Sequence, residues 1–261
     1  MNIIACQFQI AWEDPEANLA KVTELLNQRE IVPGSLIVLP ELFATGFSMN
    51  IESIADAPGV KPFLETLARR YQSWIIAGHV AKSSDGRGLN LALVYEPSGQ
   101  QLCSYTKIHP FSYGGEDKVY APGSEVKVIS IGDFQVCPFV CYDLRFPEIF
   151  RTAAVQGANT FVVIANWPAA RTHHWTTLLQ ARAIENQAYV VGLNRTGTDP
   201  KLEYDGASLV VDPQGVTVAS LANEEACLEA KISKEKMVSW RQRFPALQDS
   251  HHSFSPPAQK P

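Results

Sequence analysis

The sequence predicts an α/β protein in which two mixed β-sheets pack face to face, with helices on the outside. Short apolar runs alternate with segments of helical periodicity along the 261 residues. Turn signals join some neighbouring runs as hairpins, whereas helices between other runs indicate parallel crossovers, so the sheets are mixed. About a dozen strands exceed the usual size of one open sheet, and two packed sheets with outer helices are the natural solution.

Short apolar runs, several of them rich in β-branched residues, predict the strands. Turn-forming residues at 97–99, 132–133 and 212–215 join three pairs of these runs as hairpins. The expected strands cover residues 3–10, 36–39, 74–80, 91–95, 101–106, 126–131, 134–140, 160–165, 189–193, 208–211, 216–220 and 226–232.

Helices are predicted between these strands. Asp14 precedes Pro15, which suits an N-cap followed by proline at the first helical position. Trp175, Leu178 and Leu179 have the i, i+3, i+4 spacing of one helix face. The expected helices cover residues 15–29, 62–71, 147–156, 175–187 and 234–243. We expect one domain over residues 1–248 and a flexible tail over residues 249–261, where serine and proline accumulate.

Composition excludes several classes of partner. The net charge of -5 disfavours nucleic acid, because phosphate binding needs a basic face. No run approaches the ~20 apolar residues that span a bilayer, and the first residues lack a basic leader, so we expect a cytoplasmic protein without membrane contact. Five cysteines fit a reducing compartment better than a disulfide framework. Cys6 and Cys103 lie in predicted strands and are expected in the core.

Three ionisable residues each stand just beyond an apolar strand. They are Glu41, Lys107 and Cys141. Ligands bind beyond the carboxyl ends of strands in open α/β sheets, so we expect an acid, a cation and a thiol to meet in one cleft. Taken singly, each has a plainer interpretation: a solvated loop acid, a surface cation and a small buried hydrophobe.

Cys141 has the strongest local case, because a helix is expected to begin soon after it and a helix N-terminus lowers a thiol pKa. The alternative pairs it with Cys137 in a disulfide or metal site. Four extended residues span about 13 Å, whereas a disulfide needs Cα atoms about 5.5 Å apart. His173 and His174 are adjacent and diverge, and no H-E-x-x-H motif is present. We therefore expect no metal.

Three sequence blocks resemble the signature blocks of the nitrilase, or carbon–nitrogen hydrolase, superfamily and occur in the same order. The blocks are Leu39-Pro40-Glu41-Leu42-Phe43, Tyr105-Thr106-Lys107-Ile108-His109-Pro110-Phe111 and Val140-Cys141-Tyr142-Asp143-Leu144-Arg145-Phe146-Pro147. The resemblance implies a four-layer αββα sandwich, no metal or organic cofactor, and a homodimer. It also implies Glu41 as general base, Lys107 as stabiliser, Cys141 as nucleophile and Glu116 as a second glutamate near the site.

Two further stretches resemble the omega-amidase branch of that superfamily. They are Ala165-Asn166-Trp167-Pro168-Ala169-Ala170-Arg171 and Gln180-Ala181-Arg182-Ala183-Ile184-Glu185-Asn186-Gln187. This resemblance implies removal of the terminal amide from a 2-oxo acid amide such as 2-oxoglutaramate or 2-oxosuccinamate. The alternatives are hydrolysis of an N-carbamoyl amide or nitrile with the same three residues, and a catalytically silent member that binds a partner protein.

A 2-oxo acid amide needs its own recognition. Its carboxylate suits the planar fork of arginine, although each candidate arginine has a structural ion pair as its alternative. The candidates are Arg145, Arg171 and Arg195. Trp167 and Phe43 are expected to wall the pocket, with the plain core as their alternative. The backbone N–H of Tyr142 is expected to face the carbonyl oxygen of the substrate.

Overall fold

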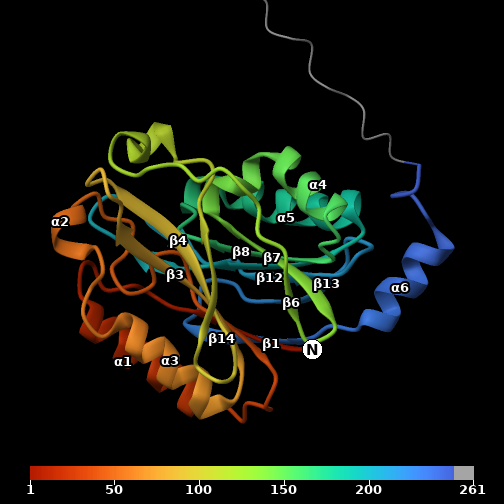
Figure 1. Cartoon of the computed structure of the whole chain (residues 1–261), viewed down its shortest axis with the longest axis horizontal. Helices are drawn as coiled ribbons and strands as arrows, with labels where there is room; N and C mark the ends of the chain where they lie inside the picture. Colours follow the sequence, from red (N-terminus) through yellow and green to blue (C-terminus); the bar gives the residue numbers. More distant parts are fainter. Residues whose placement is uncertain (250–261) are drawn as a thin grey trace, which may run out of the picture.

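The computed structural model describes residues 1–249 and contains two six-stranded sheets (Figure 1). Sheet 1 contains, in spatial order, β14 (Ala226–Lys231), β1 (Asn2–Gln7), β2 (Leu36–Val38), β3 (Trp74–Lys82), β4 (Gly88–Tyr95) and β5 (Gln101–Thr106). Sheet 2 contains β13 (Thr217–Ser220), β12 (Leu209–Val211), β9 (Tyr189–Asn194), β8 (Thr160–Ala165), β7 (Phe134–Val140) and β6 (Ile129–Ile131). A separate two-stranded ribbon pairs β10 (Thr196–Thr198) with β11 (Glu203–Asp205).

The two sheets share one strand pattern. Three parallel strands, β1-β2-β3 in sheet 1 and β7-β8-β9 in sheet 2, are flanked by antiparallel strands. In sheet 1, β4 is antiparallel to both β3 and β5, so β5 runs in the same direction as β2. The residues that follow β2 and β5 therefore leave the sheet at the same edge, as expected for Glu41 and Lys107.

Helices cover both outer faces. In Figure 1, α1 (Pro15–Asn27) and α3 (Val60–Tyr71) lie beneath sheet 1, whereas α4 (Pro147–Val155) and α5 (Thr172–Asn186) lie above sheet 2. The other helical segments are α2 (Ile51–Ile54), α6 (Lys234–Arg243) and the 3₁₀ segments η1 (Ser112–Gly114), η2 (Glu116–Lys118), η3 (Cys141–Arg145) and η4 (Ala169–Arg171). The layer order is helix, sheet, sheet, helix, which confirms the predicted fold class.

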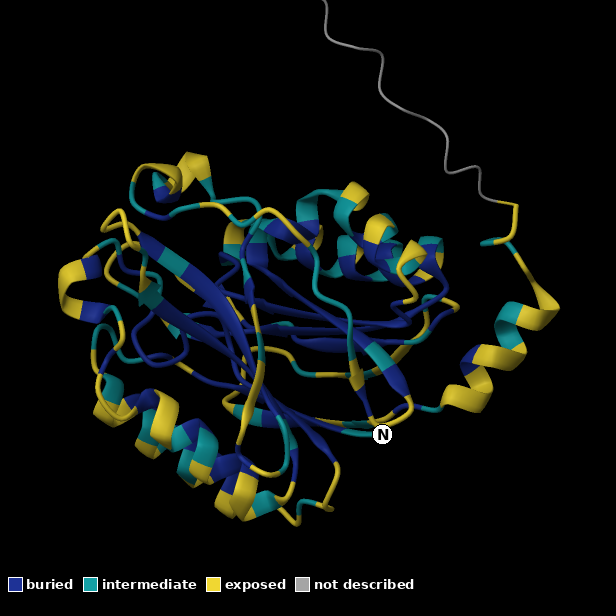
Figure 2. Ribbon diagram, in the orientation of Figure 1, coloured by how far each residue is buried: buried dark blue, intermediate teal, exposed yellow. Residues whose placement is uncertain are grey.

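Side chains of sheet 1 alternate between two cores. Ile3 and Ala5 face sheet 2, while Ile4 and Cys6 face α1 and α3, as the two-residue period of a strand requires. Figure 2 shows the resulting pattern, with buried strands inside and helices exposed on one side. Across the gap between the sheets, the rings of Tyr105 and Phe139 meet edge to face, 5.7 Å apart. Both rings lie two residues before a predicted site residue, Lys107 and Cys141 respectively.

Local signals in the sequence account for the helix ends. The side chain of Asp14 accepts a hydrogen bond from the N–H of Ala17 at 3.0 Å, with Pro15 at the start of α1, which confirms the predicted cap. The first strand is shorter than predicted. It ends at Gln7 because Phe8 and Gln9 pair with Thr196 instead. The short α2 and the β10–β11 ribbon were not predicted, since three or four residues carry no readable periodicity.

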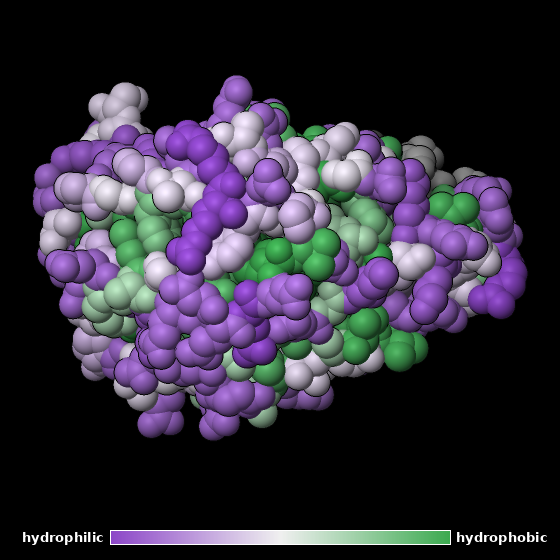
Figure 3. Space-filling view, turned by 90° about the horizontal axis from the view of Figure 1, so that it is seen from below, coloured by the Kyte–Doolittle hydropathy of each residue, from purple (hydrophilic) through white to green (hydrophobic). Residues whose placement is uncertain are grey.

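The surface is mostly hydrophilic in the view from below, with separated hydrophobic areas (Figure 3). Within residues 1–249, no helix combines the length and apolar character needed to cross a bilayer. Cys6 is fully buried as predicted, whereas Cys103 is only partly buried. Apart from Asp249, the predicted tail lies outside the described residues.

Gly78 on β3 allows the chain around Glu41 to pass close to the sheet. A Cβ atom at this position would lie 2.3 Å from the backbone nitrogen of Leu42 and 2.5 Å from the Cα of Glu41. The N–H of Gly78 donates to the carbonyl of Pro40 at 3.1 Å. Because the conflicting atoms are backbone, no rotamer change relieves them, so this position requires glycine for space.

We expect Gly78→Ala to lower the free energy of unfolding by about 3 kcal/mol, because the added methyl group must displace the turn that carries Glu41. Urea denaturation followed by circular dichroism measures this. Gly34→Ala is the matched control: its Cβ would meet no atom within 4 Å, so only the left-handed φ of +82° is strained, at a cost of about 1–2 kcal/mol. Equal losses in the two variants would contradict the close approach.

Candidate active site

Cys141 lies on a sharp turn directly after β7 and is the first residue of η3. Its φ is 48°, in the left-handed region that residues other than glycine rarely adopt. The turn places the thiol at the carboxyl end of β7, next to the first N–H groups of η3, which have no partner within the helix. A strand–turn–helix of this kind presents a nucleophile at the edge of a sheet.

Lys107 joins two carboxyl groups in the interior. Its Nζ lies 2.9 Å from Oε1 of Glu41 and 2.8 Å from Oε2 of Glu116. At most 1% of any of these three side chains is exposed. The structure therefore brings together three of the predicted residues: Glu41 after β2, Lys107 directly after β5, and Glu116 at the start of η2.

The charges of this cluster depend on one another. Burial alone would lower the pKa of Lys107, but the carboxyl groups of Glu116 and Glu41 raise it well above its usual value. Lys107 therefore stays an ammonium throughout the neutral range. Burial raises the pKa of Glu116, against the opposing effect of Lys107, and the charge of Glu41 raises it further.

Cys141 is a thiol in this resting arrangement. Burial raises the pKa of Cys141 well above its usual value, and the neighbouring charge of Glu41 raises it further, while Lys107 opposes the shift. This differs from the lowered pKa that the nearby helix start predicted, because removal from water outweighs the field of one short 3₁₀ turn. Forming a thiolate here therefore requires a base that takes the proton.

Asn90 was not predicted, although its side chain links both carboxyl groups. Its Nδ2 donates to Oε1 of Glu41 at 2.8 Å and to Oε1 of Glu116 at 2.9 Å. Asn90 lies within β4, and its only signal in the sequence is a polar residue inside the apolar run 89–94. Together with Lys107, this amide fixes the separation of the two carboxyl groups.

Asn166 connects Glu41 to the sheet that carries Cys141. Its backbone N–H donates to Oε2 of Glu41 at 2.7 Å, and its Nδ2 donates to the Glu41 carbonyl at 2.8 Å. Its own carbonyl lies 3.8 Å from Sγ of Cys141. Asn166 follows β8 directly, so the strand-end rule that identified Cys141 would also have identified it as a site residue.

Asp143 connects the Cys141 turn to the segment after Lys107. Its buried carboxylate accepts hydrogen bonds from the Tyr105 hydroxyl at 2.7 Å, the Val140 N–H at 3.1 Å and the His109 N–H at 2.9 Å. It joins β5, β7 and the loop that follows Lys107. Asp143 belongs to the sequence block around Cys141, but the sequence predicted no role for it.

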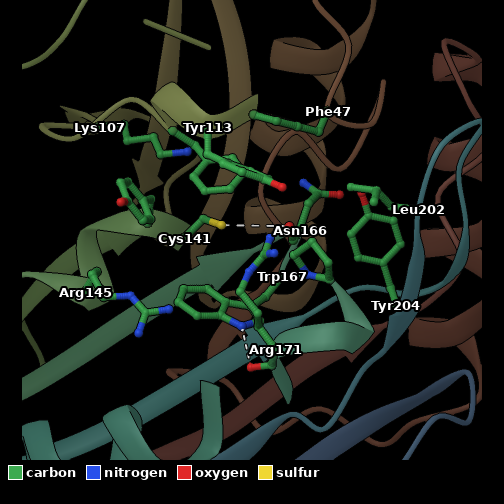
Figure 4. A pocket seen from close by; sticks show the side chains of 13 residues that line it. Phe47, Lys107, Tyr113, Cys141, Arg145, Asn166, Trp167, Arg171, Leu202 and Tyr204 are labelled. Atoms are coloured by element: carbon green, nitrogen blue, oxygen red, sulfur yellow. Dashed lines mark hydrogen bonds between the residues drawn. The ribbon is translucent and has the colours of Figure 1, made fainter. Parts of the chain in front are cut away.

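A pocket of about 300 Å³ opens above the thiol (Figure 4). Its lining residues are Phe47, Lys107, Phe111, Tyr113, Cys141, Tyr142, Arg145, Asn166, Trp167, Pro168, Arg171, Leu202 and Tyr204. Lys107 and Cys141 point into the same space in Figure 4. Four predicted pocket residues, Tyr142, Arg145, Trp167 and Arg171, line it.

Two predictions about this pocket are wrong. Phe43 is fully buried in the core between sheet 1 and the helices α1 and α3, and it does not line the pocket. Phe47, four residues later, lines the pocket instead. Arg195 is also buried away from it. Its guanidinium donates to the carbonyls of Ile10 and Thr198 and stacks on the Tyr204 ring at 4.4 Å. A strand-end position identified the region but could not say which way each side chain points.

The two remaining arginines face the pocket without an acidic partner. Arg145 lies 5.2 Å from the Trp167 ring and contacts Nδ1 of His174 at 3.2 Å. Arg171 lies 5.4 Å from the Phe111 ring. Among residues 1–249, neither guanidinium forms an ion pair with an aspartate or glutamate. The alternative interpretation of these two as structural ion pairs therefore fails.

Cys137 is a buried free thiol within β7. Its Sγ contacts the carbonyl of Pro138, and all five cysteines are free thiols, so no disulfide joins Cys137 to Cys141. Over residues 1–249, no group of three or more His, Cys, Asp or Glu side chains is arranged to hold a metal ion. The pocket exposes a thiol and an ammonium, and the Glu41 carboxyl group lies directly behind them, which suits nucleophilic attack on a carbonyl-like carbon.

We expect Asp143→Asn to lower the free energy of unfolding by about 2 kcal/mol, because an amide group loses acceptor capacity for three buried donors. Activity should fall with it, since the Cys141 turn loses its link to β5. Thermal and urea unfolding measure the first effect. Asp117→Asn, at an exposed position nearby, is the control. Identical stability of the two variants would show that the Asp143 contacts contribute little.

Comparisons with known proteins agree with this geometry. A family model described as carbon-nitrogen hydrolase matches residues 3–242. Omega-amidase YafV of Yersinia enterocolitica is 39% identical over 96% of each chain, and 2-oxoglutaramate amidase of Bacillus subtilis (strain 168) is 34% identical over 94% of this chain and 96% of its own. The crystal structure of XC1258 from Xanthomonas campestris, a CN-hydrolase superfamily protein with an arsenic adduct in the active site, has a TM-score of 0.89 at 33% identity and covers 96% of this chain and 97% of its own. The chain belongs to the carbon–nitrogen hydrolase family.

Proposed function

We propose that this chain is an amidase that removes the terminal amide of a small 2-oxo acid amide, such as 2-oxoglutaramate or 2-oxosuccinamate. The products are the 2-oxo dicarboxylate and ammonia. One observation carries the proposal: the Cys141 thiol and the Lys107 ammonium line a small pocket, and the buried Glu41 carboxyl group pairs with that ammonium and neighbours the thiol. Two arginines that have no acidic partner among residues 1–249 line the same pocket. The similarity to an omega-amidase and a 2-oxoglutaramate amidase supports the choice of substrate.

The first half of the reaction forms a thioester. Glu41 takes the proton of Cys141, and the sulfur attacks the amide carbon. Glu41 then returns the proton to the departing nitrogen, and ammonia leaves. The raised pKa of Cys141 makes this proton transfer necessary, because few thiolates exist before the substrate binds. Asn166 holds Oε2 of Glu41, which fixes the orientation of the carboxyl group for both transfers.

Lys107 is placed to stabilise the negative charge that develops on the carbonyl oxygen. An ammonium has three N–H donors. They donate to Oε1 of Glu41 and to both carboxyl oxygens of Glu116, and Lys107 also lines the pocket, so its positive charge faces the substrate oxygen. The backbone N–H of Tyr142, in the first turn of η3, supplies a second donor. Each such donor is worth about 3 kcal/mol in the transition state.

The second half of the reaction releases the acid. Ammonia leaves the pocket, and a water molecule takes its place beside Glu41. Glu41 removes a proton from this water, which attacks the thioester carbon. The sulfur leaves and regains its proton from Glu41. Glu41 acts as base and acid in turn, and its four hydrogen-bond contacts hold the carboxyl group in one orientation through both roles.

The arginines give the pocket its preference for an anionic substrate. A guanidinium binds a carboxylate through two parallel hydrogen bonds. Neither Arg145 nor Arg171 forms an ion pair with an acidic side chain within residues 1–249. A nitrile or N-carbamoyl substrate without a carboxylate would leave both cations unpaired. The volume of about 300 Å³ suits a short substrate. A silent partner-binding role would leave the strained Cys141 turn and the buried ion cluster without use.

We expect purified protein to release ammonia from 2-oxoglutaramate, and Cys141→Ala to reduce the rate by at least about 10⁴-fold, because the nucleophile is lost. Mass spectrometry during turnover should show an acyl group on Cys141 whose mass equals the substrate minus ammonia. Cys103→Ala, half-buried and away from the pocket, is the control and should retain activity. Full activity in Cys141→Ala would end the proposed mechanism.

Arg171→Ala should raise the KM for 2-oxoglutaramate by about 10- to 100-fold, since a charge-assisted bond to the carboxylate is lost. The same variant should leave hydrolysis of a neutral aliphatic amide unchanged. Arg145→Ala tests the second cation in the same way. Arg70→Ala, which removes a similar arginine–aromatic contact far from the pocket, is the control. A substrate panel in which neutral amides outperform the 2-oxo acid amides would redirect the assignment of substrate but not of reaction.

A further inference from the structure

Cys6 and Cys227 form a second thiol site, in sheet 1 and away from the pocket. They are direct partners in the antiparallel pairing of β1 with β14. Their sulfur atoms are 3.5 Å apart, although the residues are 221 positions apart in sequence. Both side chains are buried in the core that faces α1 and α3. Neither residue takes part in the amidase mechanism.

The backbone at this pair suits a disulfide. Residues directly opposite in an antiparallel ladder have Cα atoms about 4.5–5.5 Å apart, inside the range of about 4.4–6.8 Å that disulfides use. The sulfur atoms have to approach by about 1.5 Å, because a disulfide bond is about 2.05 Å long. Rotation of the two side chains can supply this shift, and Cys227 lies on β14, an edge strand. Cys103, Cys137 and Cys141 have no sulfur neighbour of this kind.

The surroundings favour Cys227 as the more reactive thiol. The hydrogen bond shared with Cys6 lowers the pKa of Cys227, and the positive charge of Arg29 lowers it further. Burial opposes both effects, as does the charge of Glu229, which pairs with Arg29 at 3.2 Å. The hydrogen bond shared with Cys227 raises the pKa of Cys6 well above its usual value, and burial raises it further. The pair therefore combines an attacking sulfur with a neighbouring thiol that can resolve it.

A small oxidant can reach Cys227 from the surface, because 6% of this residue is exposed and β14 is an edge strand. A cavity of about 350 Å³ lies beside β1 and β14, and its lining includes Ile4 and Glu229. These two residues face each other two residues along the same ladder, and so lie on the same face as Cys6 and Cys227. The cavity therefore lies one same-face residue pair away from the two cysteines, neither of which is part of its lining.

We propose that Cys6 and Cys227 are a peroxide-oxidisable dithiol that forms a disulfide between the first and last strands of sheet 1. The Cys227 thiolate attacks hydrogen peroxide, giving a sulfenic acid and hydroxide. The Cys6 sulfur then attacks the sulfenic acid, forming the S–S bond and releasing water. Two thiols and one peroxide become one disulfide and two waters, and a thiol reductant reverses the change.

The disulfide would lock the two ends of the domain together. Met1 and Ile232 already exchange two backbone hydrogen bonds at this end of sheet 1, since the terminal amine and Ile232 N–H each donate to the other's carbonyl. A covalent link between strands so distant in sequence closes nearly the whole chain into one loop. Such a loop restricts the unfolded chain strongly, which raises thermal stability.

The test treats the full chain with hydrogen peroxide, blocks remaining thiols after denaturation, and maps tryptic peptides without reduction. We use Cys141→Ala so that the pocket thiol cannot compete, which also separates this test from the amidase proposal. We expect peptide 1–21 linked to peptide 202–231, two hydrogen atoms lighter than their sum. The Tm should rise by about 10 °C on oxidation and return on reduction.

Cys6→Ser and Cys227→Ser, each added to that chain, should lose both the linked peptide and the rise in Tm, whereas Cys103→Ser should keep both. Two serine variants are used because the fully buried Cys6 site tolerates change less well than Cys227. Arg29→Gln should slow formation of the linked peptide several-fold, since it removes the charge that favours the Cys227 thiolate. If Cys6 and Cys227 are still fully alkylated after a peroxide treatment that oxidises Cys103, the proposal is overturned.

Discussion

A lysine ammonium held between two carboxyl groups in the protein interior is the interaction on which the site depends. Moving a single charge out of water costs several kcal/mol, and only close opposite charges and hydrogen bonds offset this cost. Lys107 has both, from Glu41 and Glu116, and Asn90 holds the two carboxyl groups at a fixed separation. The cluster can exist only if β2, β4, β5 and η2 are all in place, so the chemistry at the edge of sheet 1 is built by its fold.

Sheet 2 contributes the complementary half. Cys141 comes from the end of β7 and Asn166 from the end of β8, two neighbouring parallel strands. Asn166 reaches across to Glu41, so the carboxyl group accepts hydrogen bonds from both sheets. This shared carboxyl group is the point at which the thiol and the ion cluster become one site.

The architecture and the three central residues were predictable from the sequence, because strand ends and hairpin signals are local features. Glu41, Lys107 and Cys141 each follow an apolar run, and the direction of the strands brings them to one edge. The orientation of side chains was not predictable: Phe43 and Phe47 differ by four residues in an irregular loop, and Arg195 turns inward onto carbonyl oxygens. Asn90 was missed because one polar residue within a buried strand carries no signal of its partners. The 3.5 Å contact of Cys6 with Cys227 depends on pairing between the first and last strands, which no short pattern reveals.

The edge-to-face contact of Tyr105 with Phe139 has a consequence for catalysis. Each ring lies two residues before a reactive side chain, so the two rings set the spacing between the layers directly beneath the ammonium and the sulfur. The reaction rate falls once reacting groups are displaced by more than about 0.5 Å from their productive positions. Packing between the two sheets thus fixes the distance between the reacting groups at the edge of the sheets. Selection for turnover would act on aromatic residues that no substrate ever touches.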